Sequence, residues 1–243
     1  MQARITIEYD GSNYYGWQLQ TGQDSIQARL EEALGRIFST PVRVRGSGRT
    51  DAGVHALGQV AAFTLPRPFD LGELRRALNA LLPPDIVVLD AVAAGDDFDP
   101  RRHARSRVYQ YRVLNRALRS AFEYRYSWLV REPLDLDAMN RAARLFVGEH
   151  DFAAFRTMGT EVKSTVRRVL ASEWSREGKH FTYTVEASSF LRHMVRTMVA
   201  AMVDVGRGRN PPERILELLE SRERADAPAP APPAGLFLVE VRY

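Results

Sequence analysis

The chain contains no cysteine among its 243 residues, which excludes disulfides, thiolate nucleophiles and cysteine-bound zinc. Long apolar runs are missing too. No stretch of 18 apolar residues occurs, and the nearest candidate, residues 194–205, is interrupted by Arg196 and Asp204. Residues 1–6 alternate between apolar and polar side chains and lack the apolar core of a secretory signal. We therefore expect a cytoplasmic protein without membrane spans.

Two patterns that would indicate a bound cofactor are also missing. No glycine-rich nucleotide-binding motif appears, and the histidines show no spacing typical of metal ligands. We expect neither a metal nor a cofactor, and we assign these five side chains to structure or to contacts with a binding partner: His55, His103, His150, His180 and His193.

Lysine is scarce, whereas arginine is abundant. Lys163 and Lys179 are the only lysines among 34 basic residues, and the net charge is +4. Seven arginines and no acidic residue lie in residues 101–119. A run of that density suits contact with a phosphate backbone, because arginine binds phosphate with a planar, forked group. A nucleic-acid partner is thus indicated, with a solvated strand edge as the alternative.

Residues 45–55 form the most informative stretch. Their three glycines exclude a helix or strand interior, so they predict a loop between strands at 42–46 and 57–65. The loop holds one acid, Asp51, and Arg49, which we expect to bind its carboxylate. An oriented, ionised carboxylate can serve as a nucleophile or a general base. From residue types alone, a surface ion pair in a turn is the alternative.

Hydrophobic periodicity and capping residues predict the same series of elements twice. The first half is expected to contain a strand at 4–9, a helix at 25–37, strands at 42–46 and 57–65, a helix at 70–82 and a strand at 86–92. The second half is expected to contain a strand at 107–114, a helix from Asp135 closed by Gly148, strands at 165–174 and 180–187, helices at 190–205 and after Pro212, and a strand at 235–243.

Each half therefore has the order β-α-β-β-α-β. We predict an α+β fold in which two such units form a continuous, mainly antiparallel sheet, with helices on one face and an active-site cleft on the other. The expected domains are residues 1–100, which carry the Asp51 loop, and residues 101–243. The equivalent turn of the second half, near Gly178, has no aspartate, so we expect one site per chain.

Residues 9–18 are rich in turn formers and carry four aromatic side chains. Exposed aromatic rings in this loop would be able to stack on bases. The alternative is a loop that packs onto the core.

Several motifs resemble those of the tRNA pseudouridine synthase A family. The strongest is Gly48-Arg49-Thr50-Asp51-Ala52-Gly53-Val54-His55-Ala56, followed by Gly58-Gln59-Val60. Further blocks match in order, at residues 9–18, 107–111, 148–155, 190–196 and 235–238. The resemblance covers nearly the whole chain. It implies two pseudo-repeated α/β halves and isomerisation of uridine to pseudouridine at positions 38, 39 and 40 in the anticodon stem-loop of tRNA. It also implies a homodimer whose two subunits share the tRNA.

The same resemblance implies roles for individual residues. Asp51 matches the catalytic nucleophile, with Arg49 beside it. Arg196 is similar to the family's basic residue that pairs with this aspartate. Tyr109 is similar to the tyrosine that stacks on the target uracil, with a part in proton transfer left open.

Two more residues are implied in substrate binding, together with Tyr109. Leu236 matches an apolar residue that packs against the site, and Arg107 begins the family's basic-x-Tyr-x-Tyr block. From residue types alone, core packing is the alternative for Tyr109 and Leu236, and Arg196 requires a polar partner because it lies in an apolar helix.

Two other functions compete with this one. A non-catalytic RNA-binding protein of the same fold would share the arginine run, but it gives no reason for an arginine-supported aspartate in a glycine loop. A nucleoside hydrolase would release free uracil and usually needs two carboxylates, whereas the loop offers one. Attack of Asp51 on the sugar C1′, addition to uracil C6 and promotion of elimination all agree with the residues.

Overall fold

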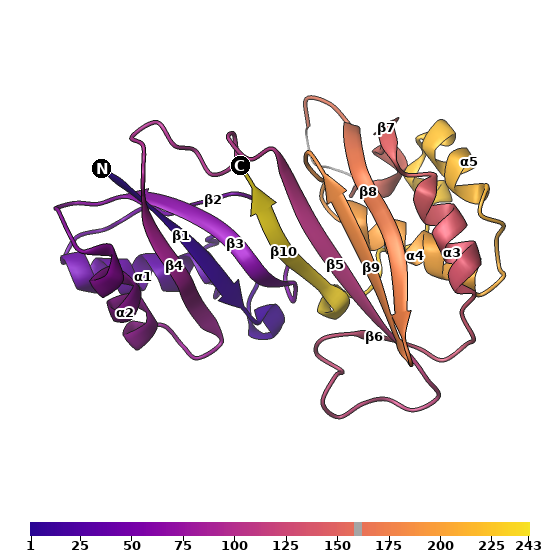
Figure 1. Ribbon diagram of the computed structural model, residues 1–243, viewed down its shortest axis with the longest axis horizontal. Coiled ribbons are helices and arrows are strands. Elements are labelled where there is room, and N and C mark those ends of the chain that lie inside the picture. Colours follow the sequence, from indigo (N-terminus) through magenta and orange to yellow (C-terminus); the bar gives the residue numbers. More distant parts are fainter. Residues whose placement is uncertain (158–161) are drawn as a thin grey trace. The chain divides into compact units, whose positions relative to one another are not determined.

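The computed structural model describes residues 1–157 and 162–243 (Figure 1). These residues form two compact units, residues 1–105 with 237–243, and residues 106–236. The last strand therefore lies in the first unit, whereas the sequence repeat assigned it to the second half. The chain passes from the first unit to the second after Arg105, five residues beyond the domain boundary expected at residue 100.

The first unit follows the predicted β-α-β-β-α-β order. Its elements are β1 (Gln2–Tyr9), α1 (Ile26–Phe38), β2 (Arg45–Gly46), β3 (His55–Thr64), α2 (Leu71–Leu81) and β4 (Ile86–Ala94), with β10 (Leu236–Arg242) from the end of the chain. The strands lie in the order β4-β1-β3-β10, and β2 pairs with β3. Strand β1 is antiparallel to both neighbours, whereas β10 runs parallel to β3.

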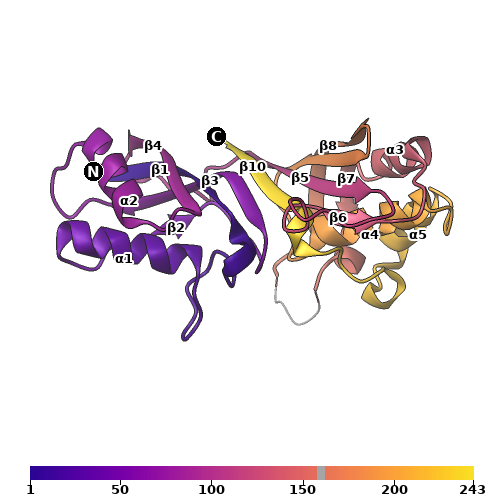
Figure 2. The same cartoon turned by 90° about the horizontal axis from the view of Figure 1, so that it is seen from below.

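Both helices of this unit begin where their capping residues predict. Ser25 Oγ accepts a hydrogen bond from the amide of Ala28, and the Asp70 carboxylate accepts one from the amide of Glu73. The apolar side of each helix is buried, and α1 and α2 lie on the same face of the strands (Figure 2). Burying one leucine side chain of this kind contributes about 1.5–3 kcal/mol.

The strand predicted at 42–46 is shorter than expected, because only Arg45 and Gly46 pair with β3. Val44 is buried, but its backbone is bonded to side chains of α1. Its amide donates to Glu31 Oε1 and its carbonyl accepts from Gln27 Nε2. These side chains replace the strand partner that the alternation of Val42 and Val44 predicted.

Apart from the last strand, the second unit contains the predicted elements, and it has two additional strands, β6 and β7. Its elements are β5 (Ser106–Asn115), β6 (Trp128–Val130), α3 (Leu136–Arg144), β7 (Gly148–Asp151), β8 (Val166–Glu177), β9 (His180–Ala187), α4 (Met194–Gly206) and α5 (Arg214–Ser221). The strands lie in the antiparallel order β5-β9-β8-β7, and β6 pairs with β5 in parallel. Helix α3 packs against β8 and α4, and α4 also contacts β5.

Two predicted helix boundaries in this unit were wrong. Helix α4 begins at Met194 rather than at residue 190, because His193 has a φ of 64° and cannot belong to a right-handed helix. Helix α3 ends at Arg144, and Gly148, which we expected to close it, begins β7. The α+β class with mainly antiparallel strands is nevertheless confirmed. Within the described ranges, no helix is long and apolar enough to cross a membrane.

An asparagine side chain joins a helix to an open strand edge in each unit. Asn79 of α2 donates to the carbonyl of Val88 on β4 at 2.9 Å and accepts from its amide at 2.7 Å. Asn140 of α3 makes the same pair of bonds with Trp174 of β8, at 3.0 and 2.8 Å. The side-chain amides thus take the place of a neighbouring strand.

Replacing either asparagine by alanine should destabilise its unit, because one backbone amide and one carbonyl lose their partner. We expect Asn79→Ala and Asn140→Ala each to lower the free energy of unfolding by about 1–3 kcal/mol in urea titrations. Asn13→Ala, at an exposed position, is the control and should change it by less than about 0.5 kcal/mol. Losses equal to that of the control would show that the paired bonds do not stabilise the helices.

Candidate active site

The loop that carries Asp51 is tethered at its start by a buried glutamine. Gln59 of β3 is fully buried, and its Oε1 accepts from Ser47 Oγ at 2.7 Å while its Nε2 donates to the carbonyl of Gly48 at 3.0 Å. The amide of Ser47 also donates to the carbonyl of Val60. The chain therefore enters the loop in one fixed conformation.

Thr50, directly before Asp51, is held at two atoms. Its Oγ1 lies 2.8 Å from the hydroxyl of Tyr9, and its carbonyl accepts from the amide of Trp17 at 3.0 Å. All three of these side chains are buried, and the rings of Tyr9 and Trp17 lie 6.3 Å apart.

Tyr14 holds the other side of the loop. Its carbonyl accepts from the amide of Gly53 at 3.3 Å, and the amide of Val54 donates to the carbonyl of Asp51 at 3.1 Å, which closes a turn. The Tyr14 hydroxyl donates to Asp85 at 2.6 Å. Burial, with the hydrogen bond to Asp85, raises the pKa of Tyr14 well above its usual value.

Two glycines allow residues 11–17 to lie directly against this loop. A Cβ on Gly16 would lie 2.5 Å from the carbonyl oxygen of Thr50, and a Cβ on Gly11 would lie 2.0 Å from that of Val54. Gly16 also has a φ of 87°, which side-chain-bearing residues rarely adopt. No other residue type fits at either position without moving the loop.

Asp51 is half-buried, whereas Arg49 is exposed. Between these two residues, the side chain of Thr50 turns inward to Tyr9.

Tyr109 and Arg107 lie on β5 in the second unit, and both are largely buried. The ring of Tyr109 meets that of Phe190 edge to face, with centroids 5.0 Å apart. A guanidinium nitrogen of Arg107 donates to the carbonyl of Ser188 at 2.9 Å.

Arg196 lies in the first turn of α4 and fixes the proline-rich segment that precedes β10. Its Nε donates to the carbonyl of Ala231 at 2.7 Å, and the Ala231 amide donates back to the Arg196 carbonyl. The hydroxyl of Tyr111 donates to the next carbonyl, that of Pro232, at 2.7 Å. Burial raises the pKa of Tyr111 above its usual value, and the charge of Arg196 opposes this shift. Leu236, four residues further on, is buried.

The proposed site residues belong to both units of the chain. Asp51 and Arg49 lie on the loop of the first unit, and the others lie in the second: Arg107, Tyr109, Arg196 and Leu236. Of the four aromatic residues at 9–18, only Tyr15 is substantially exposed, at 57%. The base-stacking expectation is therefore wrong for Tyr9, Tyr14 and Trp17.

Sequence reasoning missed the residues that hold the loop. The signal for Gln59 is its place in the centre of an apolar strand, because a glutamine there indicates a buried polar bond. Among the described residues, no three histidine, aspartate or glutamate side chains gather as a metal site would.

Comparison with known proteins identifies the family. The sequence profile of the family described as tRNA pseudouridine synthase matches residues 5–101 and 142–243. The chain belongs to the tRNA pseudouridine synthase family.

Several relatives in this family match the chain over almost its whole length, and each of them is named tRNA pseudouridine synthase A. The protein of Myxococcus xanthus is 46% identical over 242 residues, covering 99% of this chain and 91% of its own. Those of Pelobacter propionicus and Geobacter sulfurreducens are 47% and 48% identical over 240 residues, covering 99% of this chain and 98% of theirs. A chain of a solved Cbf5-Nop10-Gar1 complex matches at 13% identity over 82% of this chain and 54% of its own, with a TM-score of 0.34, which is too distant to inform the fold.

In this family member, Gly16→Ala should destabilise the first unit more than Gly22→Ala does. Both glycines have a positive φ, but only Gly16 faces a backbone atom, because nothing lies within 4 Å of a Cβ at Gly22. We expect the difference in unfolding free energy, measured in urea, to be about 1–3 kcal/mol. Equal losses would mean that the backbone angle alone, and not the contact with Thr50, requires glycine.

Proposed function

We propose that this chain converts uridine to pseudouridine at positions 38, 39 and 40 of the anticodon stem-loop of tRNA, in the cytoplasm. The observation that carries the proposal is the rigidly held Asp51 loop in a chain whose relatives, matched almost end to end, are named tRNA pseudouridine synthase A. The three positions come from the family resemblance.

The reaction is an isomerisation. The bond between uracil N1 and ribose C1′ breaks, the base turns, and C5 bonds to C1′ in its place. The proton on C5 leaves and N1 gains one, so the atoms balance without an oxidant, a reductant or an energy source. The base must leave the stack before any side chain reaches it.

Asp51 is the proposed nucleophile. The loop offers a single carboxylate, and the backbone on both sides of it is hydrogen-bonded to residues 9–17 and to its own turn. A carboxylate whose main chain cannot move meets the substrate in one orientation, which lowers the entropic part of the barrier. Arg49, which is exposed, is proposed to contact the RNA beside it.

The residues of the second unit take the roles that the family resemblance implies. Tyr109 is proposed to stack on the flipped uracil, a contact worth about 1–3 kcal/mol for one base. Arg196 is proposed to balance the charge of the catalytic carboxylate, Arg107 to bind substrate, and Leu236 to pack against the base. The arginine-rich residues 101–119 supply phosphate contacts.

Asp51→Asn tests the proposal directly. The amide keeps the shape of the side chain but is not a nucleophile of comparable strength, so pseudouridine formation should cease while tRNA binding persists. Release of tritium from tRNA labelled at uridine C5 measures the rate, with free uracil measured in parallel. Asp90→Asn, at an exposed position on β4, is the matched control and should retain the wild-type rate.

Three results would contradict the proposal. An Asp51→Asn rate above about a tenth of wild type corresponds to a barrier change under about 1.4 kcal/mol, too small for loss of the nucleophile. Free uracil without pseudouridine would indicate a hydrolase. Binding of tRNA by a wild-type chain without turnover would indicate an RNA-binding protein.

We also propose that the chain acts as a homodimer, and residues 116–127 support this. They form the loop between β5 and β6 that projects from the strands in Figure 1. Three large apolar side chains on it are strongly exposed, Leu118 at 78%, Phe122 at 89% and Tyr124 at 58%. Exposed apolar groups gathered on one surface are typical of an interaction site.

Hydrogen bonds hold this loop in shape despite its exposure. Arg116 donates to the carbonyls of Leu118 and Arg119, and Ser120 Oγ accepts from the amides of Phe122 and Glu123. A loop ordered before association loses little conformational entropy when it binds.

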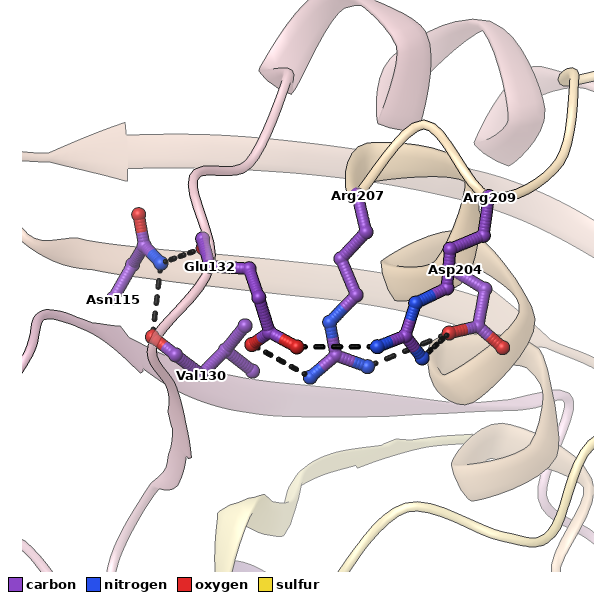
Figure 3. A network of polar contacts seen from close by, with 6 residues as sticks. All are labelled: Asn115, Val130, Glu132, Asp204, Arg207 and Arg209. Atoms are coloured by element: carbon purple, nitrogen blue, oxygen red, sulfur yellow. Dashed lines mark hydrogen bonds and ion pairs between the residues drawn. The ribbon is translucent and has the colours of Figure 1, made fainter.

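The base of the loop is fixed by a second set of bonds, drawn in Figure 3. Asn115 donates to the carbonyls of Val130 and Glu132. The Glu132 carboxylate pairs with Arg207 at 3.3 Å and with Arg209 at 3.1 Å, and both arginines also pair with Asp204 of α4. The chain on either side of the loop is thereby held together and joined to α4.

A groove of about 250 Å³ lies beside the exposed side chains. It is lined mainly by apolar groups, among them Leu114, Trp128, Leu129 and Pro232. A projecting ring and an apolar groove on one surface are self-complementary, as a two-fold symmetric dimer requires. A second copy of this chain is therefore the proposed occupant.

Phe122→Arg should convert the dimer to monomers, because it places a charge in the apolar contact. Light scattering coupled to gel filtration measures the mass, which should fall from two chains to one. Leu89→Arg, which places the same charge at an exposed apolar residue on β4, is the control and should leave the mass unchanged. A wild-type mass of one chain, or a Phe122→Arg variant that keeps the mass of two, would contradict the dimer or its location.

A further inference from the structure

We infer that the buried hydroxyl pair of Tyr9 and Thr50 fixes the position of the Asp51 carboxylate during the reaction. The two residues are positioning residues, since they act through Asp51. The inference rests on the proposed function, in which Asp51 is the nucleophile.

Thr50 transmits the constraint because one peptide bond separates it from Asp51. Its side chain is bonded to Tyr9 at 2.8 Å and its carbonyl to the Trp17 amide at 3.0 Å. The two bonded atoms of Thr50, Oγ1 of the side chain and the carbonyl oxygen, branch from its Cα in different directions. Holding both of them fixes the plane of the peptide that leads to Asp51.

The residues that follow Asp51 are held as well. The Asp51 carbonyl accepts from the Val54 amide at 3.1 Å, and the Gly53 amide donates to the Tyr14 carbonyl at 3.3 Å. The Cα of Asp51 therefore lies between two anchored stretches. The main chain at Asp51 is thus held on both sides of the residue.

Tyr9 is a rigid anchor for this arrangement. It ends β1, where it pairs with Ala56 of β3 on one edge and with Ile86 of β4 on the other. Its side chain is 2% exposed. The sheet thus fixes the position of the Tyr9 hydroxyl, and this hydroxyl in turn fixes Thr50 in the loop through their hydrogen bond.

A hydroxyl pair has directionality that an apolar contact lacks. Phenylalanine and valine would fill nearly the same space at these two positions, and burial alone would favour them. A hydrogen bond adds a preferred distance and angle. Displacement of a catalytic group by about 1 Å costs about 100-fold in rate, so a constraint of this kind matters for turnover.

Tyr9→Phe removes the hydroxyl and keeps the ring. We expect kcat for pseudouridine formation to fall by about 10-fold or more, with KM within about twofold of wild type, since the substrate contacts are unchanged. Tyr183→Phe is the matched control. Tyr183 is also fully buried, and its hydroxyl lies 2.7 Å from Ser172 Oγ in the second unit. It should cost stability without the loss in kcat.

Substitutions of Thr50 test whether the two hydroxyls act as a pair. Thr50→Val should lower kcat as Tyr9→Phe does, and the double variant should lose no more than either single variant. Thr50→Ser keeps the hydroxyl and should retain most of the activity. Additive losses in the double variant would overturn the inference.

Hydrogen exchange gives a readout that does not depend on activity. The amides of Trp17 and Val54 bond to the carbonyls of Thr50 and Asp51, so Tyr9→Phe should speed their exchange, whereas Tyr183→Phe should not. A wild-type chain that forms no pseudouridine overturns the proposed function together with this inference. A chain that Asp51→Asn inactivates but whose kcat and exchange Tyr9→Phe leaves unchanged overturns this inference alone.

Discussion

Two stretches of backbone lie in direct contact where residues 11–17 meet the loop that carries Asp51. Such contact demands that every buried amide and carbonyl find a partner, because no water remains to serve as one. The amides of Trp17 and Gly53 meet the carbonyls of Thr50 and Tyr14 for this reason. A loop rich in glycine would be mobile in isolation, and here these bonds give it the order of a strand or helix.

The arrangement separates the roles of neighbouring residues in a short sequence. Thr50 turns inward and connects the loop to the sheet, Arg49 turns outward to solvent, and Asp51 lies between these environments. The main chain around the half-buried Asp51 is hydrogen-bonded on both sides, as the proposed role of a nucleophile requires. Of these three consecutive residues, Thr50 thus holds the loop in place, while Asp51 and Arg49 are left for the proposed contacts with the substrate.

Local signals in the sequence predicted most of the fold. Ser25 and Asp70 cap the helices that their positions indicate, and the β-α-β-β-α-β order is present in the first unit. The predicted element boundaries were wrong where the local sequence pattern does not determine the backbone. Val44 is paired by side chains of α1, and the left-handed conformation of His193 delays α4. Neither effect leaves a periodic pattern.

The candidate site was predictable to a similar extent. The glycines and the single carboxylate placed Asp51 on a loop between strands, and family motifs supplied the remaining residues. The place of Gln59 in an apolar strand signalled a buried polar bond, but not its partner Gly48. The partner of the Tyr9 hydroxyl was likewise not predictable, because Tyr9 and Thr50 are far apart in the sequence. Residue spacing does not specify which way a side chain points, so the bond between Arg49 and Asp51 stays a prediction.

The return of β10 to the first unit has a consequence for biosynthesis. Phe237 pairs with His55, at the point where the Asp51 loop enters β3, and the two rings stack with centroids 4.7 Å apart. A ribosome makes Phe237 only 182 residues after His55. The sheet beside the proposed nucleophile therefore stays unfinished until β10 has been made. A chain without β10 would expose the edge of β3 to pairing with other chains, so the order of synthesis delays the completed sheet until this distant strand exists.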